Sequence, residues 1–121
     1  MPTRLSSPVR IFYPKFDQAY LLRILPERLK ILQRELQVLQ VVLFGSYAKG
    51  NFTVGSDVDL LIVYKGGKRA DAYAIAKRTL DIPLLEPHLY SEDEYKEMEG
   101  IINKMSDGGI LIKFEKPLTS Q

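Results

Sequence analysis

Two short apolar runs, residues 38–44 and 57–64, constrain the fold of this chain more than any other feature. The first reads VLQVVLF and stops at Gly45. The second reads DVDLLIVY and ends in the turn Lys65-Gly66-Gly67-Lys68. Short runs rich in β-branched residues and bounded by glycine are typical of buried strands. The centre of the fold is therefore expected to be a sheet.

Leucines recur at intervals of three and four after Phe16, which places them on one face of a helix. The set is Leu22, Leu25, Leu29, Leu32 and Leu36. Pro26 lies within this pattern, lacks a backbone donor and disfavours helical geometry at the residue before it. We therefore expect the helix either to kink at Pro26 or to be split there.

The rest of the chain alternates between helix and strand patterns. Residues 70–80 carry small and apolar side chains at helical spacing, and residues 84–90 predict a third strand. A capping box at residues 91–94 predicts a helix that runs towards Met105, and residues 110–114 predict a last short strand. This order predicts an α/β (α+β) domain with a single small mixed sheet and helices packed on one face.

Length and composition fit one domain, because 121 residues with 45% hydrophobic content can bury an ordinary core. We place the domain at residues 15–115, between an N-terminal arm at 1–14 and a C-terminal tail at 116–121. The 17 basic and 15 acidic residues are mixed along the chain, so the charge of +2 leaves nucleic-acid binding open.

The chain contains no cysteine, which excludes a disulfide, a thiolate zinc site and a thiol nucleophile. Any metal must be bound by oxygen or by His88, the one histidine. No apolar run approaches the ~20 residues that span a bilayer, and the N-terminus lacks a signal-peptide core. We therefore expect a cytoplasmic protein with no membrane partner.

The segment FGSYAKG, residues 44–50, ends a strand at Gly45 and Ser46. A helix start offers free N–H groups to a phosphate, glycine permits close approach, and the Ser46 hydroxyl adds a donor. Lys49 either contacts the phosphates or is an ordinary solvated lysine. An isolated Gly-Ser pair is also common in plain turns, and Asn51-Phe52 stands where a P-loop needs Lys and Ser or Thr.

Asp57 and Asp59 form the second group of candidate residues. Strand alternation would point both to one face, with Cα atoms about 6.5 to 7 Å apart. Val58, Leu60 and Ile62 would then face the helices and leave the aspartates on the open face of the sheet. Two neighbouring carboxylates repel each other, so the pair favours a bound cation, and Mg²⁺ prefers such ligands. The alternative is a polar strand start that faces water.

Gly45-Ser46, the ten residues that follow and Asp57-Val58-Asp59 together resemble the signature of the DNA polymerase β-like nucleotidyltransferase superfamily, especially its minimal nucleotidyltransferases. The resemblance covers roughly residues 16–114 in element order. It implies transfer of a nucleoside monophosphate from a nucleoside triphosphate, expected to be ATP, to an acceptor hydroxyl with release of pyrophosphate. Two Mg²⁺ ions would be held by Asp57, Asp59 and a third carboxylate.

The resemblance points to residues 84–90 for the third carboxylate, and we choose Glu86. In a strand, Glu86 would share a face with His88 and Tyr90, which matches the open face expected for Asp57 and Asp59. Asp81 is the alternative, although it lies nearer the end of a helix, and Pro87 is awkward within a strand. His88 itself is interpreted as a hydrogen-bonded strand residue rather than a ligand.

Two other classes of function compete with an enzyme. Minimal relatives in toxin–antitoxin pairs neutralise a small helical partner by binding or nucleotidylating it, so the resemblance also implies an antitoxin-like binding module. A purely structural domain is the third class. Because 121 residues leave no room for a domain that selects the acceptor, a homodimer or a partner is expected to complete the site.

Overall fold

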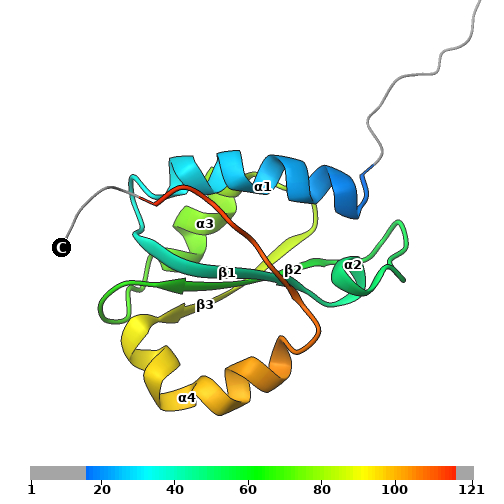
Figure 1. The fold of residues 1–121 in the computed structure, drawn as a ribbon. Coiled ribbons are helices and arrows are strands. Elements are labelled where there is room, and N and C mark those ends of the chain that lie inside the picture. Colours follow the sequence, from blue (N-terminus) through cyan, green and yellow to red (C-terminus); the bar gives the residue numbers. More distant parts are fainter. Residues whose placement is uncertain (1–15, 117–121) are drawn as a thin grey trace, which may run out of the picture.

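The structure, a computed structural model, describes residues 16–116 (Figure 1). The predicted arm at 1–14 lies outside the described residues, as does the predicted tail except for Lys116. In chain order the elements are α1 (Gln18–Leu32), β1 (Val38–Phe44), α2 (Ser46–Lys49), β2 (Val58–Tyr64), α3 (Ala72–Leu80), β3 (Leu85–Ser91), α4 (Glu92–Met105) and β4 (Ile110–Leu111).

The strands form one mixed sheet in the order β3-β2-β1-β4. β1 runs antiparallel to both β2 and β4, whereas β2 and β3 are parallel. The predicted α+β class with a single mixed sheet is therefore confirmed. The last strand is shorter than predicted, because after Ile112 donates to the carbonyl of Val41 (2.9 Å) the chain crosses towards α1, where Glu115 pairs with Lys30 at 3.2 Å.

α1 is held to the sheet by leucines on one face. Leu21, Leu25, Leu29 and Leu32 are fully buried, whereas Leu22 is only partly buried. The Asp17 side chain caps the helix by accepting from the N–H of Tyr20 at 2.9 Å. Pro26 lies inside α1 rather than dividing it. Because a proline inside a helix costs about 3 kcal/mol, the buried leucines on either side must offset that loss.

The main core lies between one face of the sheet and the helices α1 and α3. From β2 it takes Val58, Leu60, Ile62 and Tyr64, each with at most 2% of its surface exposed. The expected orientation of Val58, Leu60 and Ile62 towards helices is confirmed. By alternation, Asp59 and Leu61 point to the other face of the sheet.

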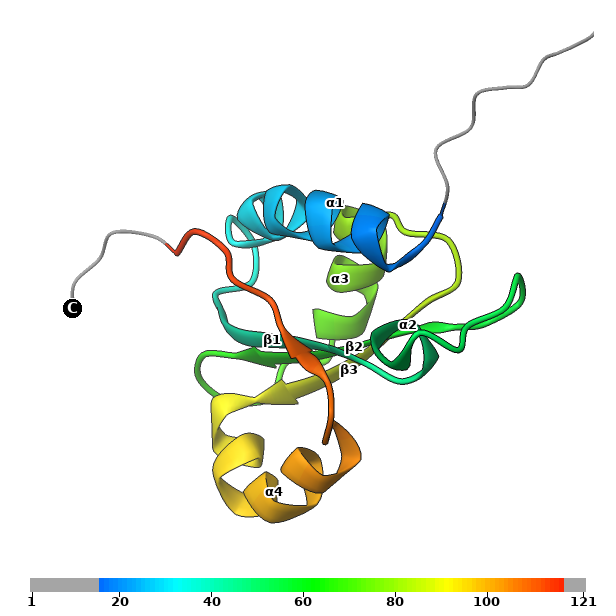
Figure 2. The ribbon, with the colours of Figure 1, turned by 45° about the vertical axis from the view of Figure 1, so that its right-hand side comes forward.

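The expectation that the helices pack on one face holds for α1 and α3 but is wrong for α4, which covers the opposite face (Figure 2). There Ile102 of α4 is buried against Val42, Phe44 and Leu61. β1 and β2 carry apolar side chains on both faces, so a second layer is needed to remove Leu61 and its neighbours from water. The nearly continuous apolar run of each strand was the signal for this second layer.

The predicted capping box begins α4. The Ser91 hydroxyl accepts from the N–H of Glu94 at 3.1 Å, and the Glu94 carboxylate accepts from the N–H of Ser91 at 2.9 Å. The irregularity in this helix falls at Met98, whose φ of −116° and ψ of 19° are not helical. Among the helices of residues 16–116, none has the length and apolar character to cross a membrane.

Replacement of Ile102 by alanine tests the packing of α4 on the second face. Ile102 is 1% exposed, and truncation of such a side chain leaves a cavity, so we expect Ile102→Ala to lower the free energy of unfolding by about 2–5 kcal/mol. The neighbouring Ile101 is 68% exposed and provides a matched control, for which we expect a change of about 0.5 kcal/mol or less. Urea denaturation measures both values, and equal effects would contradict the packing.

Candidate active site

The end of β1 meets the start of β2 at one end of the two central strands. Phe44 and Asp59 are partners in the antiparallel pair, so the turn after Phe44 lies beside the Asp59 carboxylate. Gly45 has a φ of 78° and a ψ of −154°, a conformation that only glycine adopts readily. A Cβ atom at Gly45 would overlap Oδ2 of Asp59 and lie 3.3 Å from Cβ of Asp59. The two halves of the predicted motif are therefore in contact.

The short helix α2 follows this turn directly. The Gln18 side chain of α1 donates to the carbonyls of Tyr47 (2.9 Å) and Ala48 (3.1 Å), which ties α2 to α1. The ring of Tyr47 is buried, stacks on Phe52 at 4.3 Å and meets Phe16 edge-on at 5.7 Å. Burial raises the pKa of the Tyr47 hydroxyl. These contacts fix the backbone that carries Ser46, and nothing in the sequence pointed to Gln18, which is 29 residues from Tyr47.

The two predicted aspartates have different settings. β2 begins at Val58, so Asp57 lies just before the strand and is exposed, whereas Asp59 lies within the strand with a side chain 27% exposed. Strand alternation therefore fixes the face of Asp59 but not that of Asp57. Lys49, the last residue of α2, is exposed, and its role in phosphate binding stays a prediction.

Glu86 lies beside Asp59 on the neighbouring parallel strand, because the register of β2 and β3 pairs the two residues directly. Paired residues of adjacent strands point to the same face of a sheet. Asp81, the alternative, is instead exposed and caps the end of α3 in a left-handed conformation with a φ of 47°. The geometry thus favours Glu86 over Asp81 as the third carboxylate.

His88 also belongs to this face of the sheet. Its Nε2 atom lies 3.2 Å from Oδ1 of Asp59, and its ring centroid lies 5.0 Å from that of Phe44. The interpretation of His88 as a hydrogen-bonded strand residue is therefore confirmed, but its partner was not predicted. The signal for that partner was the spacing of two residues between Glu86 and His88, which puts both on the face of Asp59.

The candidate carboxylates fit a hard cation by their chemistry, since Asp57, Asp59 and Glu86 offer only oxygen ligands. Asp59 and Glu86 lie side by side on adjacent strands, and both keep partial exposure to solvent. Within residues 16–116, however, no three His, Asp or Glu side chains are grouped closely enough to hold a metal ion. The three carboxylates are therefore candidate ligands that must move closer together to bind one cation.

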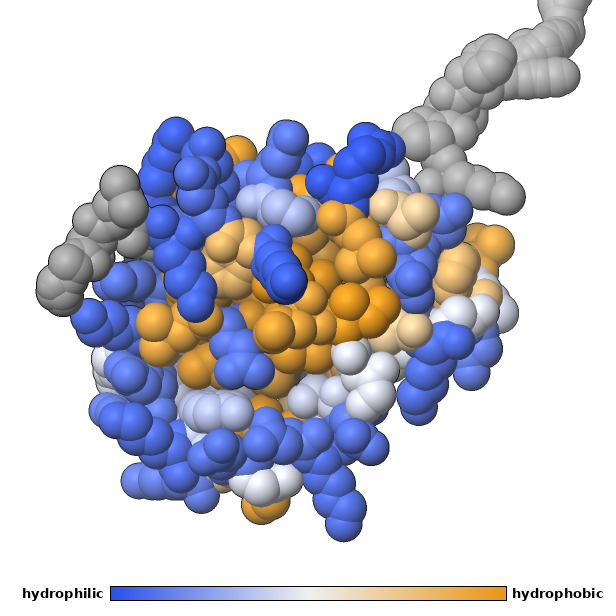
Figure 3. All heavy atoms as spheres, in the orientation of Figure 1, coloured by the Kyte–Doolittle hydropathy of each residue, from blue (hydrophilic) through white to orange (hydrophobic). Residues whose placement is uncertain are grey.

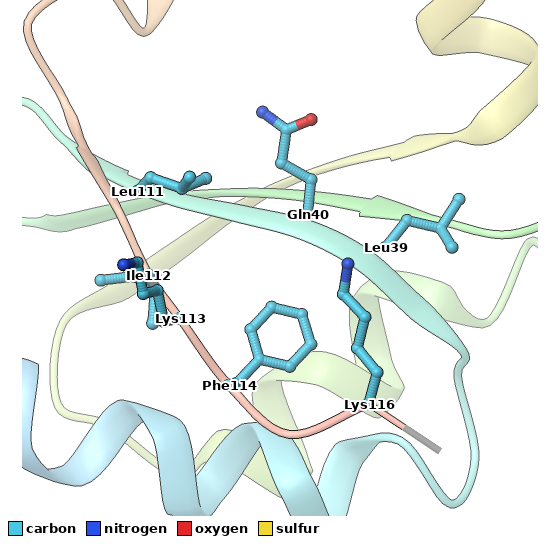
Figure 4. Close-up of a pocket in the computed structure, with 7 residues that line it drawn as sticks. All are labelled: Leu39, Gln40, Leu111, Ile112, Lys113, Phe114 and Lys116. Atoms are coloured by element: carbon cyan, nitrogen blue, oxygen red, sulfur yellow. The ribbon is translucent and has the colours of Figure 1, made fainter. Parts of the chain in front are cut away.

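Two pockets lie near α2 and β1. One, of about 420 Å³, adjoins α2 and is lined by Phe16, Tyr47, Phe52, Thr53 and Val54. The other, of about 490 Å³, lies between β1 and the chain after β4 and is lined by Leu39, Gln40, Leu111, Ile112, Lys113, Phe114 and Lys116 (Figure 4). It opens on an apolar area where that segment crosses β1 (Figure 3). The larger pocket contains no carboxylate, so it does not belong to the candidate active site.

The four-stranded mixed sheet and its four helices match a nucleotidyltransferase fold. The family model of the nucleotidyltransferase domain matches residues 25–116 of the chain. The chain therefore belongs to the nucleotidyltransferase domain family.

Solved structures agree with this assignment at the level of the fold. A provisionally named nucleotidyltransferase from Sulfolobus solfataricus, solved by crystallography, is similar with a TM-score of 0.58 and 21% sequence identity. The similarity covers 84% of this chain and 90% of that protein. Among curated proteins, none matches the chain.

Replacement of Gly45 by alanine tests the contact between the turn and Asp59. The backbone conformation alone should lower the free energy of unfolding by about 1–3 kcal/mol, and the new methyl group must displace the Asp59 carboxylate. We expect Gly45→Ala to remove any stabilisation of the protein by Mg²⁺ and ATP in a thermal melt.

Gly50 provides the matched control for this substitution. It also has a positive φ, of 85°, but a Cβ atom there meets nothing within 4 Å. We expect Gly50→Ala to lower stability by about 1–2 kcal/mol while the thermal response to Mg²⁺ and ATP is kept. Loss of that response in both variants would show that backbone strain, rather than contact with Asp59, is responsible.

Proposed function

We propose that the chain is a Mg²⁺-dependent nucleotidyltransferase that transfers a nucleoside monophosphate from ATP to an acceptor hydroxyl and releases pyrophosphate. The family assignment supports nucleotidyl transfer in general. The observation that carries the finer proposal is the contact between Gly45 and the Asp59 carboxylate, which brings the phosphate-binding turn and the predicted ligand together. The choice of ATP and of Mg²⁺ goes beyond the family assignment.

The proposal assigns a separate role to each group of residues. The backbone N–H groups at the start of α2 and the Ser46 hydroxyl bind the β- and γ-phosphates, since the first N–H groups of a helix have no partner within it. The acceptor oxygen attacks the α-phosphorus in line, and the bond to the bridging oxygen of the pyrophosphate breaks. Glu86, beside Asp59, accepts the proton of the acceptor hydroxyl.

Asp57, Asp59 and Glu86 would hold Mg²⁺, two ions in the full site. When bound, Mg²⁺ supplies charge stabilisation for the attacking and leaving oxygens. The exposed position of Asp57, just before β2, lets its side chain turn towards Asp59 without disturbing the strand. This supports a site whose ligands converge only when the cation and the triphosphate are present.

Substitution of the aspartates tests the triphosphate site. A ligand at one hundred times its dissociation constant stabilises a protein by about 2.7 kcal/mol, so the wild-type melting temperature should rise with Mg²⁺ and ATP together. We expect Asp57→Asn and Asp59→Asn each to reduce this rise strongly, and the double variant to abolish it. Asp107→Asn, at an exposed position after α4, is the control. An unchanged rise in the double variant would refute the proposed site.

Glu86 and Asp81 can be distinguished by transfer of label from each α-labelled triphosphate to a cell extract, followed by separate protease and nuclease digestion. We expect Glu86→Gln to lower transfer by about 10²- to 10⁴-fold, the range for loss of a general base. Asp81→Asn should transfer at the wild-type rate, because Asp81 lies at the end of α3. The opposite result would assign the third carboxylate to Asp81. A label lost to protease but not to nuclease would identify a protein acceptor.

A binding module, such as an antitoxin that neutralises a small helical partner, is the second candidate. The separation of Asp57, Asp59 and Glu86 favours it, because within residues 16–116 these side chains do not form a group that could hold a metal ion. We also propose that a second copy of the chain or another partner completes the site. Co-purification of a second chain, with no rise in melting temperature on addition of Mg²⁺ and ATP, would favour binding over catalysis.

A further inference from the structure

His88 lies where one face of the sheet changes from polar to apolar. On β3 it stands two residues after Glu86, the partner of Asp59, and two residues before Tyr90, which packs with the apolar cluster beneath α4. The His88 side chain is 29% exposed, so its ring is in contact with protein over most of its surface. His88 thus lies between the candidate active site and the apolar cluster beneath α4.

The imidazole ring of His88 contacts Phe44, and its Nε2 atom contacts Asp59. The ring lies 5.0 Å from the ring of Phe44, at an angle of 58°, and this contact shields its apolar surface. The Nε2 atom lies 3.2 Å from Oδ1 of Asp59. An ionised carboxylate can only accept hydrogen bonds, so Nε2 must carry the proton and donate it. A purely apolar side chain could reproduce the contact with Phe44 but not the donation to Asp59.

The two oxygens of Asp59 consequently face different neighbours. Oδ1 is taken by His88 on β3, while Oδ2 faces Gly45 and the turn that leads into α2. Gly45 leaves room for Oδ2, because a Cβ atom at that position would overlap it. The side chain of Asp59 is therefore held by β3 through Oδ1, while Oδ2 lies on the side of Gly45.

We propose that His88 is a positioning residue, which orients Asp59 so that Oδ2 is presented towards the Gly45-Ser46 turn. The orientation of Asp59 follows from the geometry alone, and its value for cation binding rests on the proposed function. Without His88, the Asp59 side chain would sample several rotamers, and a cation would have to select the productive one. This role differs from that of a metal ligand, because His88 acts through Asp59.

The first test measures the rotamer of Asp59 directly, in the full chain without metal or nucleotide. Three-bond couplings from the Asp59 Cβ protons report whether one χ1 rotamer is populated. We expect a single rotamer in the wild type and averaging in His88→Leu, which keeps apolar bulk but removes the donor. His88→Gln restores a donor and should restore the single rotamer. Tyr90→Phe, on the same strand face, should leave the couplings unchanged.

The second test measures the dissociation constant of Mn²⁺ by electron paramagnetic resonance. We expect His88→Leu to weaken Mn²⁺ binding about tenfold, the order that one hydrogen bond to a charged group provides. In an Asp59→Asn background, His88→Leu should have no further effect, because its partner is already lost. An equal weakening in that background would overturn the proposal, since His88 would then act independently of Asp59.

The two tests separate this inference from the proposed function. A single Asp59 rotamer in both the wild type and His88→Leu would overturn the positioning role, whatever the protein binds. Averaging in His88→Leu, together with a wild-type chain that binds neither Mn²⁺ nor Mg²⁺ with ATP, would refute the proposed function while the positioning of Asp59 stands.

Discussion

Burial of β2 on both faces is the constraint on which the rest of the structure depends. Val58, Leu60 and Ile62 require the layer of α1 and α3, and Leu61 on the other face requires α4. Asp59 is the polar exception on that second face, one alternation before Leu61. The carboxylate therefore lies on a strand with a fixed backbone, at the point where the apolar covering ends.

Local patterns in the sequence predicted the elements that depend on interactions between residues close together in the chain. The capping box of Ser91 and Glu94 predicted the start of α4, and the leucine spacing predicted α1, because caps and helical periodicity depend on residues three or four apart. Strand alternation likewise predicted which face of β2 packs against the helices. The short β4 was predicted too long, because Ile112 and the residues after it turn towards α1, which no nearby residue reveals.

The candidate site could be predicted as a set of residues but not as an arrangement. Gly45 and Asp59 were found through their joint pattern, and their contact follows from the antiparallel pairing of β1 and β2. The hydrogen bond of His88 to Asp59 needs the register of β2 and β3, which is set by tertiary packing. Family membership supports nucleotidyl transfer in general.

The antiparallel pairing of Phe44 with Asp59 also bears on the spacing between the two halves of the motif. The loop between them joins the end of β1 to the start of β2, so the hydrogen bonds between these two strands hold its ends together. Its outer part, around Gly55, is exposed and has open space beside it. Closing a loop twice as long adds only about 0.6 kcal/mol of entropy loss. The number of residues in this loop is thus a weak thermodynamic constraint, and the strand register at its two ends is the strong one.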